Sequence, residues 1–157
     1  MAKPKKIPNF NPDLGLDKCL PKILNTRLNE MISFEKGTIA GKDIEYLHNM
    51  RVASRRIQAV LKAFRKFYPK DKFKKEYEML RSLTQALGIV RHYDVFISVL
   101  EKYNETLEPV MRSSMEFLII QQKSHRAQKR TELVNLIKLL NRGRFKEHFR
   151  EFISLNK

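Results

Sequence analysis

The sequence has little of the material from which metal sites and catalytic centres are built. Cys19 is the only cysteine in 157 residues, which excludes an intramolecular disulfide and a thiolate zinc site. The five glycines form no glycine-rich loop of the kind that cradles nucleotide phosphates. The histidines are scattered without a ligand pair, at His48, His92, His125 and His148. We therefore expect no bound metal, no cofactor and no enzymatic activity.

Apolar runs long enough to cross a membrane are also missing. The most apolar piece, residues 117–120, is far shorter than the run of about 18 residues that a membrane-spanning helix needs. The N-terminal segment lacks the apolar core of a signal peptide. Together with the single cysteine, these absences predict a soluble protein of the cytoplasm.

Charge, in contrast, is present in excess and is mostly of one sign. The chain has 32 Lys and Arg residues against 17 Asp and Glu residues, a net charge of +15 at pH 7. Such an excess favours an anionic partner, which can be nucleic acid, a phosphate polymer or a membrane surface. The hydrophobic content of 42% suffices for a folded core. We predict a basic flexible arm over residues 1–13, which is rich in proline and lysine, and one domain over residues 14–157.

Apolar residues recur at helical spacing, and no segment alternates as a strand does. The pattern predicts five helices that begin near residues 14, 42, 71, 109 and 144. We expect Pro21 to mark the true start of the first helix or a kink in it, and the second helix to run to Tyr68. Gly88 is expected to weaken or bend the third helix. The predicted fold class is all-α, an antiparallel helical bundle with a basic face or channel.

The second predicted helix, over residues 42–68, divides sharply into two faces. Its apolar side comprises Tyr46, Met50, Ala53, Ile57, Val60, Leu61, Phe64, Phe67 and Tyr68. Its opposite side carries a stripe of cations, namely His48, Arg51, Arg55, Lys62 and Lys66, with Arg56 beside it. No acidic residue lies between His48 and Pro69. A solvated face normally mixes charges, because like charges repel along a helix. The stripe therefore predicts a polyanion site, with a plain solvated face as the alternative.

A second set of cations follows the same spacing in the fourth predicted helix. Lys123, Arg126 and Arg130 lie at i, i+3 and i+7, so they share one face of a helix. They either belong to the same site or form an ordinary basic surface.

Two stretches of the chain, residues 48–64 and 80–100, resemble the CHAD domain, the conserved histidine α-helical domain. The residues that carry the resemblance are His48, Arg51, Val52, Ala53, Arg55, Arg56, Leu87, Gly88, Arg91, Asp94 and Val95. The resemblance implies binding of inorganic polyphosphate without catalysis, and it places Arg81 and Arg91 near the same channel. Arg91 has an alternative role in an ion pair with Asp94, one helical turn on, which would make Asp94 an orienting group. His92 stands where the family usually has Asp.

CHAD domains are typically two related helical bundles around a basic channel, and this chain is long enough for one. We therefore expect two copies of the chain to assemble as a homodimer that completes the channel. Polyphosphate binding would also imply association with polyphosphate granules in the cytoplasm.

Two other functions remain open from the residues alone. RNA or other nucleic acid would fit the charge, but aromatic residues are not interleaved with the cations as in single-strand binders. A phosphotransfer domain centred on His48 would need a carboxylate to orient the imidazole, and the nearby Asp43 and Glu45 lie on other faces of the helix. If His48 instead contacts phosphate, binding is expected to be tighter at pH 6 than at pH 8.

Overall fold

The computed structural model describes residues 3–8, 11, 13 and 15–155, and within these residues it contains helices and no strands. The α-helices are α1 (Leu16–Ser33), α2 (Glu35–Ala40), α3 (Ile44–Ala63), α4 (Lys70–Glu105), α5 (Pro109–Arg142) and α6 (Phe145–Ile153). A single turn of 3₁₀ helix, η1 (Arg65–Phe67), connects α3 to α4. The predicted all-α bundle is confirmed.

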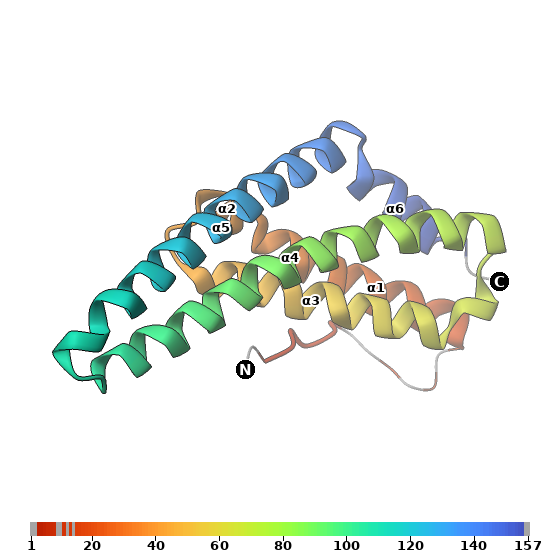
Figure 1. Cartoon of the computed structure of the whole chain (residues 1–157). Coiled ribbons are helices and arrows are strands. Elements are labelled where there is room, and N and C mark those ends of the chain that lie inside the picture. Colours follow the sequence, from red (N-terminus) through yellow and green to blue (C-terminus); the bar gives the residue numbers. More distant parts are fainter. Residues whose placement is uncertain (1–2, 9–10, 12, 14, 156–157) are drawn as a thin grey trace.

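The helices are arranged around one long hairpin (Figure 1). α1, α2 and α3 pack together, α4 packs on α3, and α5 returns along α4. α6 then folds back and contacts α1, α4 and α5. The main core is formed by apolar side chains from α1, α3, α4, α5 and α6. Leu24, Ile57, Leu87 and Phe149 are fully buried in it. Each helix therefore contributes one apolar face to a shared interior.

α3, which was predicted to run to Tyr68, is shorter than its sequence pattern. At its N-terminus the Asp43 side chain accepts a hydrogen bond from the backbone N–H of Glu45 at 2.8 Å, which caps the helix. At the other end α3 stops at Ala63, and the chain tightens into η1 before Pro69 opens α4. A helix cannot continue smoothly into proline, because the residue before proline is pushed toward extended backbone.

α4 runs through Gly88 as one uninterrupted helix, although Gly88 was expected to weaken or bend it. Glycine inside a helix costs about 1 kcal/mol relative to alanine. Burial of the adjacent Leu87 and Val90, both with no exposed surface, offsets that cost. The first helix also begins earlier than Pro21, at Leu16, so the proline lies inside α1 and does not start it. Among the described residues, none of the helices is both long and apolar enough to traverse a bilayer.

Candidate anion-binding site

A polar groove of about 290 Å³ lies between α3 and α4. We call it the arginine groove, and its lining residues are Arg51, Arg55, Gln58, Arg81, Thr84, Gln85 and Gly88. Arg51 and Arg55 are one helical turn apart on α3, and Arg81 is on the α4 side of the groove. The groove therefore brings together three of the predicted cations from two helices that are separated by the α3–α4 connection.

The guanidinium groups of Arg51 and Arg55 are available for a ligand. Within the described part of the chain, neither forms an ion pair with a carboxylate. Arg81 has a partner, Glu78, but the pair is 3.6 Å apart and both side chains are more than half exposed. Ion pairs of that kind contribute little free energy. An anion in the groove would therefore meet positive charge that the fold itself has not neutralised.

The floor of the groove is polar and well ordered. Gln58 Nε2 donates a hydrogen bond to Thr84 Oγ1 at 2.8 Å, and Thr84 Oγ1 in turn donates to the Leu80 carbonyl at 2.8 Å. At Gly88, an added Cβ would lie 3.4 Å from Nε of Arg51. This is an ordinary contact distance, so the Arg51 side chain packs directly beside Gly88 of α4. The hydrogen bond from Gln58 to Thr84 joins the two walls of the groove.

His48 lies one turn before Arg51 on α3 and is partly buried. Its pKa is lowered from the ordinary value, first by burial and then by the positive charge of Arg91 and of Arg51, with Glu45 acting in the opposite direction. Its Nδ1 atom is buried and has no hydrogen-bond partner among the described residues. His48 is thus neutral at pH 7 in the free protein, and no carboxylate orients it as a general base requires.

Asp94 does not pair with Arg91, although the sequence spacing suggested that pair. Arg91 instead lies 4.0 Å from Glu45 of α3, and Asp94 Oδ1 accepts a hydrogen bond from Nε of Arg126 at 2.5 Å. Asp94 therefore pairs with an arginine of α5 and not with Arg91. The reason is geometric: Asp94 is buried and faces α5, so the nearest cation is across the helix pair.

The α5 cations form contacts within the fold. Lys123 pairs with Glu101 at 2.7 Å, and Arg126 pairs with Asp94. Arg130 donates from its guanidinium to the Ile39 carbonyl at 2.6 Å, and the same group lies where a Cβ on Gly41 would stand. These three residues belong to α5, and none of them lines the arginine groove.

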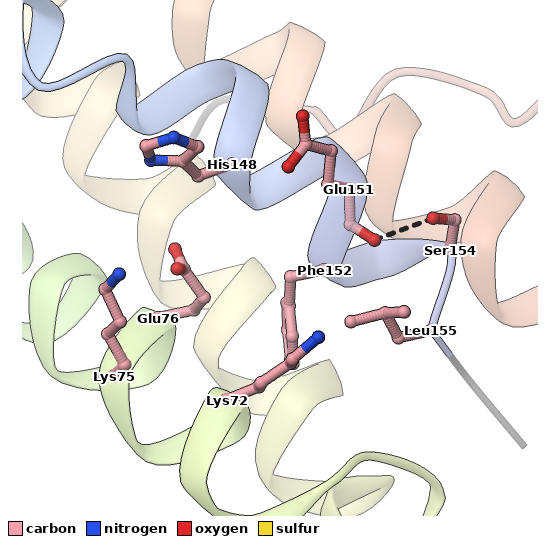
Figure 2. A pocket seen from close by; sticks show the side chains of 8 residues that line it. All are labelled: Lys72, Lys75, Glu76, His148, Glu151, Phe152, Ser154 and Leu155. Atoms are coloured by element: carbon pink, nitrogen blue, oxygen red, sulfur yellow. Dashed lines mark hydrogen bonds between the residues drawn. The ribbon is translucent and has the colours of Figure 1, made fainter.

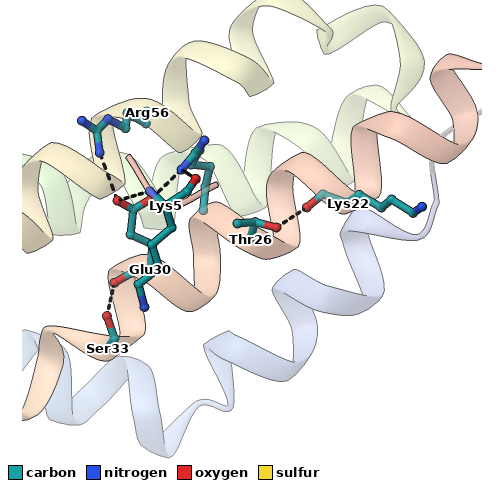
Figure 3. A network of polar contacts seen from close by, with 7 residues as sticks. Lys5, Lys22, Thr26, Glu30, Ser33 and Arg56 are labelled. Atoms are coloured by element: carbon teal, nitrogen blue, oxygen red, sulfur yellow. Dashed lines mark hydrogen bonds and ion pairs between the residues drawn. The ribbon is translucent and has the colours of Figure 1, made fainter. Parts of the chain in front are cut away.

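Arg56, next to Arg55 in the sequence, faces a different helix (Figure 3). Its guanidinium lies 3.0 Å from Glu30 of α1, and Arg27 lies 2.7 Å from the other oxygen of the same carboxylate. Glu30 has a side chain that is only 2% exposed. The backbone N–H of Lys5 also donates to Glu30, at 3.4 Å, so part of the N-terminal arm lies against α1. Arg56 therefore joins α1 to α3 by a buried ion pair.

The remaining cations of the α3 stripe lie further along the chain. Lys62 is exposed in the last turn of α3. Lys66 is part of η1 and not of α3, and it lines a separate depression of about 640 Å³ with Arg65, Lys70 and Phe73. The stripe predicted from helical spacing is thus interrupted after Lys62, because the helix ends.

A further pocket of about 370 Å³ lies between α4 and α6 and has mixed charge (Figure 2). Figure 2 shows the Glu76 carboxylate directed toward His148, with Lys72 and Lys75 along α4. Burial raises the pKa of Glu76, while Lys75 and His148 oppose that shift. Because the carboxylates of Glu76 and Glu151 line it, this pocket is a poorer anion site than the arginine groove.

Four groove residues were not among the predicted site residues: Gln58, Thr84, Gln85 and Gly88, of which the resemblance had named Gly88 alone. The sequence alone could have identified Gln58 as a groove residue. It follows Arg55 by three residues and Arg51 by seven, so it lies on the same face of the helix. Thr84 and Gln85 become visible only once α4 is placed against α3.

Comparison with known proteins gives one match. The family model of the CHAD domain matches residues 22–157, which is nearly the whole chain. No curated protein and no solved structure matches the chain.

Proposed function

Because this chain belongs to the CHAD domain family, we propose that it binds inorganic polyphosphate in the arginine groove and catalyses no reaction on it. The family is associated with polyphosphate binding and not with catalysis. Membership extends over both α3 and α4, the two helices that form the groove.

The observation that carries the proposal is the state of Arg51 and Arg55. Each forms no ion pair with the described carboxylates, although the chain has acidic residues that neutralise Arg56 and Arg126 elsewhere. Leaving two cations one turn apart without a counter-charge costs self-repulsion. A bound polyanion removes that cost.

Inorganic polyphosphate suits the chemistry of the groove. The polymer carries closely spaced charge and no bases, so its binder needs cations and hydrogen-bond donors and no stacking surface. Arginine donates forked, charge-assisted hydrogen bonds to phosphate oxygens. Gln85 lines the same groove and has an amide N–H group as a further donor. Binding releases counterions, so affinity should fall steeply with salt.

Cations outside the groove would extend the binding path for a long chain. His48 and Arg91 lie beyond Arg51, toward the start of α3, and Lys62 lies beyond Arg55 in the other direction. Lys66 adds charge in the depression that η1 forms. A polymer that follows α3 would meet His48 and Lys62 on either side of the groove, and it would reach Lys66 only beyond the end of the helix. We also propose that two copies of the chain pair, so that two such paths serve one polymer.

The experiment is a calorimetric titration with long-chain polyphosphate at about 150 mM salt, where long-range surface effects are largely screened. The test variant is Arg51→Glu/Arg55→Glu, which should lose affinity by at least about a hundredfold, since two charge-assisted contacts become repulsions. The matched control is Lys138→Glu/Arg142→Glu. These two exposed residues are also one turn apart, on α5, and the control changes the net charge equally. An equal loss in both variants would mean that the protein responds to total charge and has no defined groove.

RNA is the alternative ligand, and the same titration tests it. Single-stranded and duplex RNA are added in excess to the polyphosphate complex. Displacement of polyphosphate by RNA would favour a nucleic-acid function, whereas failure of RNA to compete supports recognition of the phosphate polymer.

A further inference from the structure

The exposed apolar side chains of this protein are concentrated at one place. Thirteen large hydrophobic residues are exposed among the described residues, and nine of them lie between Ile89 and Ile120. We call residues 89–122, the outer parts of α4 and α5 together with their connection, the hairpin tip. Figure 1 shows the tip extending past the other helices. Scattered exposed apolar residues are ordinary, but a concentration of this kind marks an interaction surface.

On α4 four exposed apolar residues share one side of the helix, with His92 between the first two of them. Ile89, Phe96, Val99 and Tyr103 follow one another at steps of seven, three and four residues, and they are 46%, 39%, 57% and 56% exposed. This is the spacing with which one helix packs against another in a coiled coil or a four-helix bundle. We call these four residues the α4 line. A helix with such a line and no described partner on that face presents half of a helix–helix interface.

The tip has only a thin core of its own. The core cluster of the tip consists of Ile97, Leu100 and Ile119, and the side chains packed on them also come from α4 and α5 alone. An apolar groove of about 450 Å³ adjoins the α4 line, since Tyr103 belongs to both. Leu107, Val110 and Met111 also line this groove. A two-helix hairpin cannot bury its apolar surface by itself, and a second pair of helices would complete a four-helix arrangement.

The charge of the tip limits which partners can bind to it. Residues 89–122 contain three Lys or Arg residues and five Asp or Glu residues. Two of these acids, Asp94 and Glu101, pair with Arg126 and Lys123 just beyond the segment, so the tip is close to neutral in a chain of +15. Two molecules of this protein repel each other over most of their surfaces, and they repel least where the tips meet. A tip of this charge is also unsuited to an anionic membrane or to a polyanion, both of which attract clustered cations.

We propose that the hairpin tip is the surface on which a second copy of this chain docks, with the α4 lines of the two copies packed against each other across a two-fold axis. This identifies the contact surface of the dimer proposed above and does not depend on what the arginine groove binds. A two-fold contact pairs the same patch on both copies, so a single self-complementary apolar line is sufficient to form it. The basic groove residues Arg51, Arg55 and Arg81 lie outside the contact, where they stay open to a ligand.

The test measures the oligomeric state of the full chain by sedimentation velocity over about a hundredfold range of concentration, because dimer formation depends on concentration. The test variant is Phe96→Glu/Val99→Glu, which places four carboxylates at the interface of a dimer. The control is Ile44→Glu/Leu139→Glu, which introduces the same charge at residues of similar exposure, 45% and 64%, outside the tip. All four positions are on the surface, so both variants should keep the helical circular dichroism of the parent protein.

The proposal expects a dimer for the parent protein and for the control, and a monomer for the test variant. A dimer that persists in the test variant would place the contact elsewhere, and a parent protein that stays monomeric at every concentration would remove the proposal. Polyphosphate affinity of the test variant separates this question from the proposed function. A monomeric variant that still binds short polyphosphate supports both proposals, while a dimeric protein without polyphosphate affinity would refute the function alone.

Discussion

Arg126 of α5 donates a hydrogen bond from Nε to Oδ1 of Asp94, 32 residues earlier on α4, at 2.5 Å. The Asp94 side chain is 2% exposed, and its Oδ2 atom is buried without a hydrogen-bond partner among the described residues. A buried carboxylate is stable only when a cation or several donors compensate its lost hydration. The two longest helices are thus joined by a buried charge pair, in addition to the exposed Lys123–Glu101 pair. Removing either member of the buried pair leaves the other partly buried without its counter-charge.

Asp94→Asn should destabilise the protein by about 2 kcal/mol, because Arg126 loses its counter-charge while remaining partly buried. Urea unfolding followed by circular dichroism measures the change. The comparison variant is Glu132→Gln, which removes the exposed pair with Lys129 and should cost less than about 0.5 kcal/mol. Equal effects of the two substitutions would contradict a structural role for the Asp94–Arg126 pair.

Two adjacent arginines should separate binding from stability. Arg55→Gln should weaken polyphosphate binding by about tenfold and leave the unfolding free energy nearly unchanged, because Arg55 is exposed in the groove. Arg56→Gln should have the opposite effect, since it leaves Glu30 with one fewer cation in a buried site. We expect a loss of about 2 kcal/mol with little change in affinity. Calorimetry measures the affinity of both variants, and urea unfolding measures their stability. If the same variant showed the larger loss in both affinity and stability, the separate roles of Arg55 and Arg56 would be contradicted.

Glu76→Gln should stabilise the protein at neutral pH. Burial raises the pKa of Glu76, so the folded chain holds this proton to a higher pH than the unfolded chain does. Its favourable contribution is complete below the ordinary pKa and is lost as the pH rises through the raised pKa. The glutamine variant has no such loss, so its advantage should grow from nearly zero at pH 4 to about 1 kcal/mol at pH 7, or roughly 2–4 °C in Tm. Glu151→Gln, at an exposed position of the same pocket, is the matched control for the loss of one carboxylate.

His48 should make polyphosphate binding depend on pH. Its pKa is lowered in the free protein, mainly by burial, so the imidazole is less protonated at pH 6 than that of an ordinary histidine. A phosphate chain beside it raises that pKa, and the complex then takes up a proton as the pH falls. Affinity should be about threefold higher at pH 6 than at pH 8. Titrations of the parent protein, His48→Gln and His148→Gln compare the two conditions, and a pH dependence that persists in His48→Gln would exclude this histidine.

His48 should also make the stability of the free protein depend on pH, but here acidification is unfavourable. Because the folded pKa of His48 is below the unfolded value, its contribution to stability is complete above pH 6.5 and decreases as the pH falls. Unfolding measurements in the absence of ligand should therefore show a shallower loss on acidification in His48→Gln than in the parent protein.

Helical periodicity predicted the faces of α3 well, since the sides of that helix follow from residue spacing alone. Met50, Ala53, Ile57 and Leu61 are buried as their spacing indicated. Tyr46 was assigned to the same side and is 43% exposed, because it lies near the start of the helix and packs beside Gly37. Helix ends were harder to place, since they depend on how the connections to neighbouring helices are accommodated.

The partners of individual charges could not be read from local spacing. Arg55 and Arg56 are adjacent in the sequence, yet Arg56 meets Glu30 because α1 packs on that side of α3. Asp94 has a local candidate in Arg91, one turn away, but it is directed toward α5 and Arg126. In both cases the acid and the base are brought together by tertiary packing, which periodicity does not contain.

The return of α6 onto α1 has a consequence for the newly made chain. Phe145, Phe149, Phe152 and Ile153 of α6 are all buried in the core, and Arg150 reaches back 121 residues to Asn29. The ribosome adds roughly 5–20 residues each second, so about ten seconds separate the synthesis of α1 from that of α6. Until α6 arrives, the apolar faces that it covers stay open to water. The nascent chain is therefore the form of this protein in most need of a chaperone.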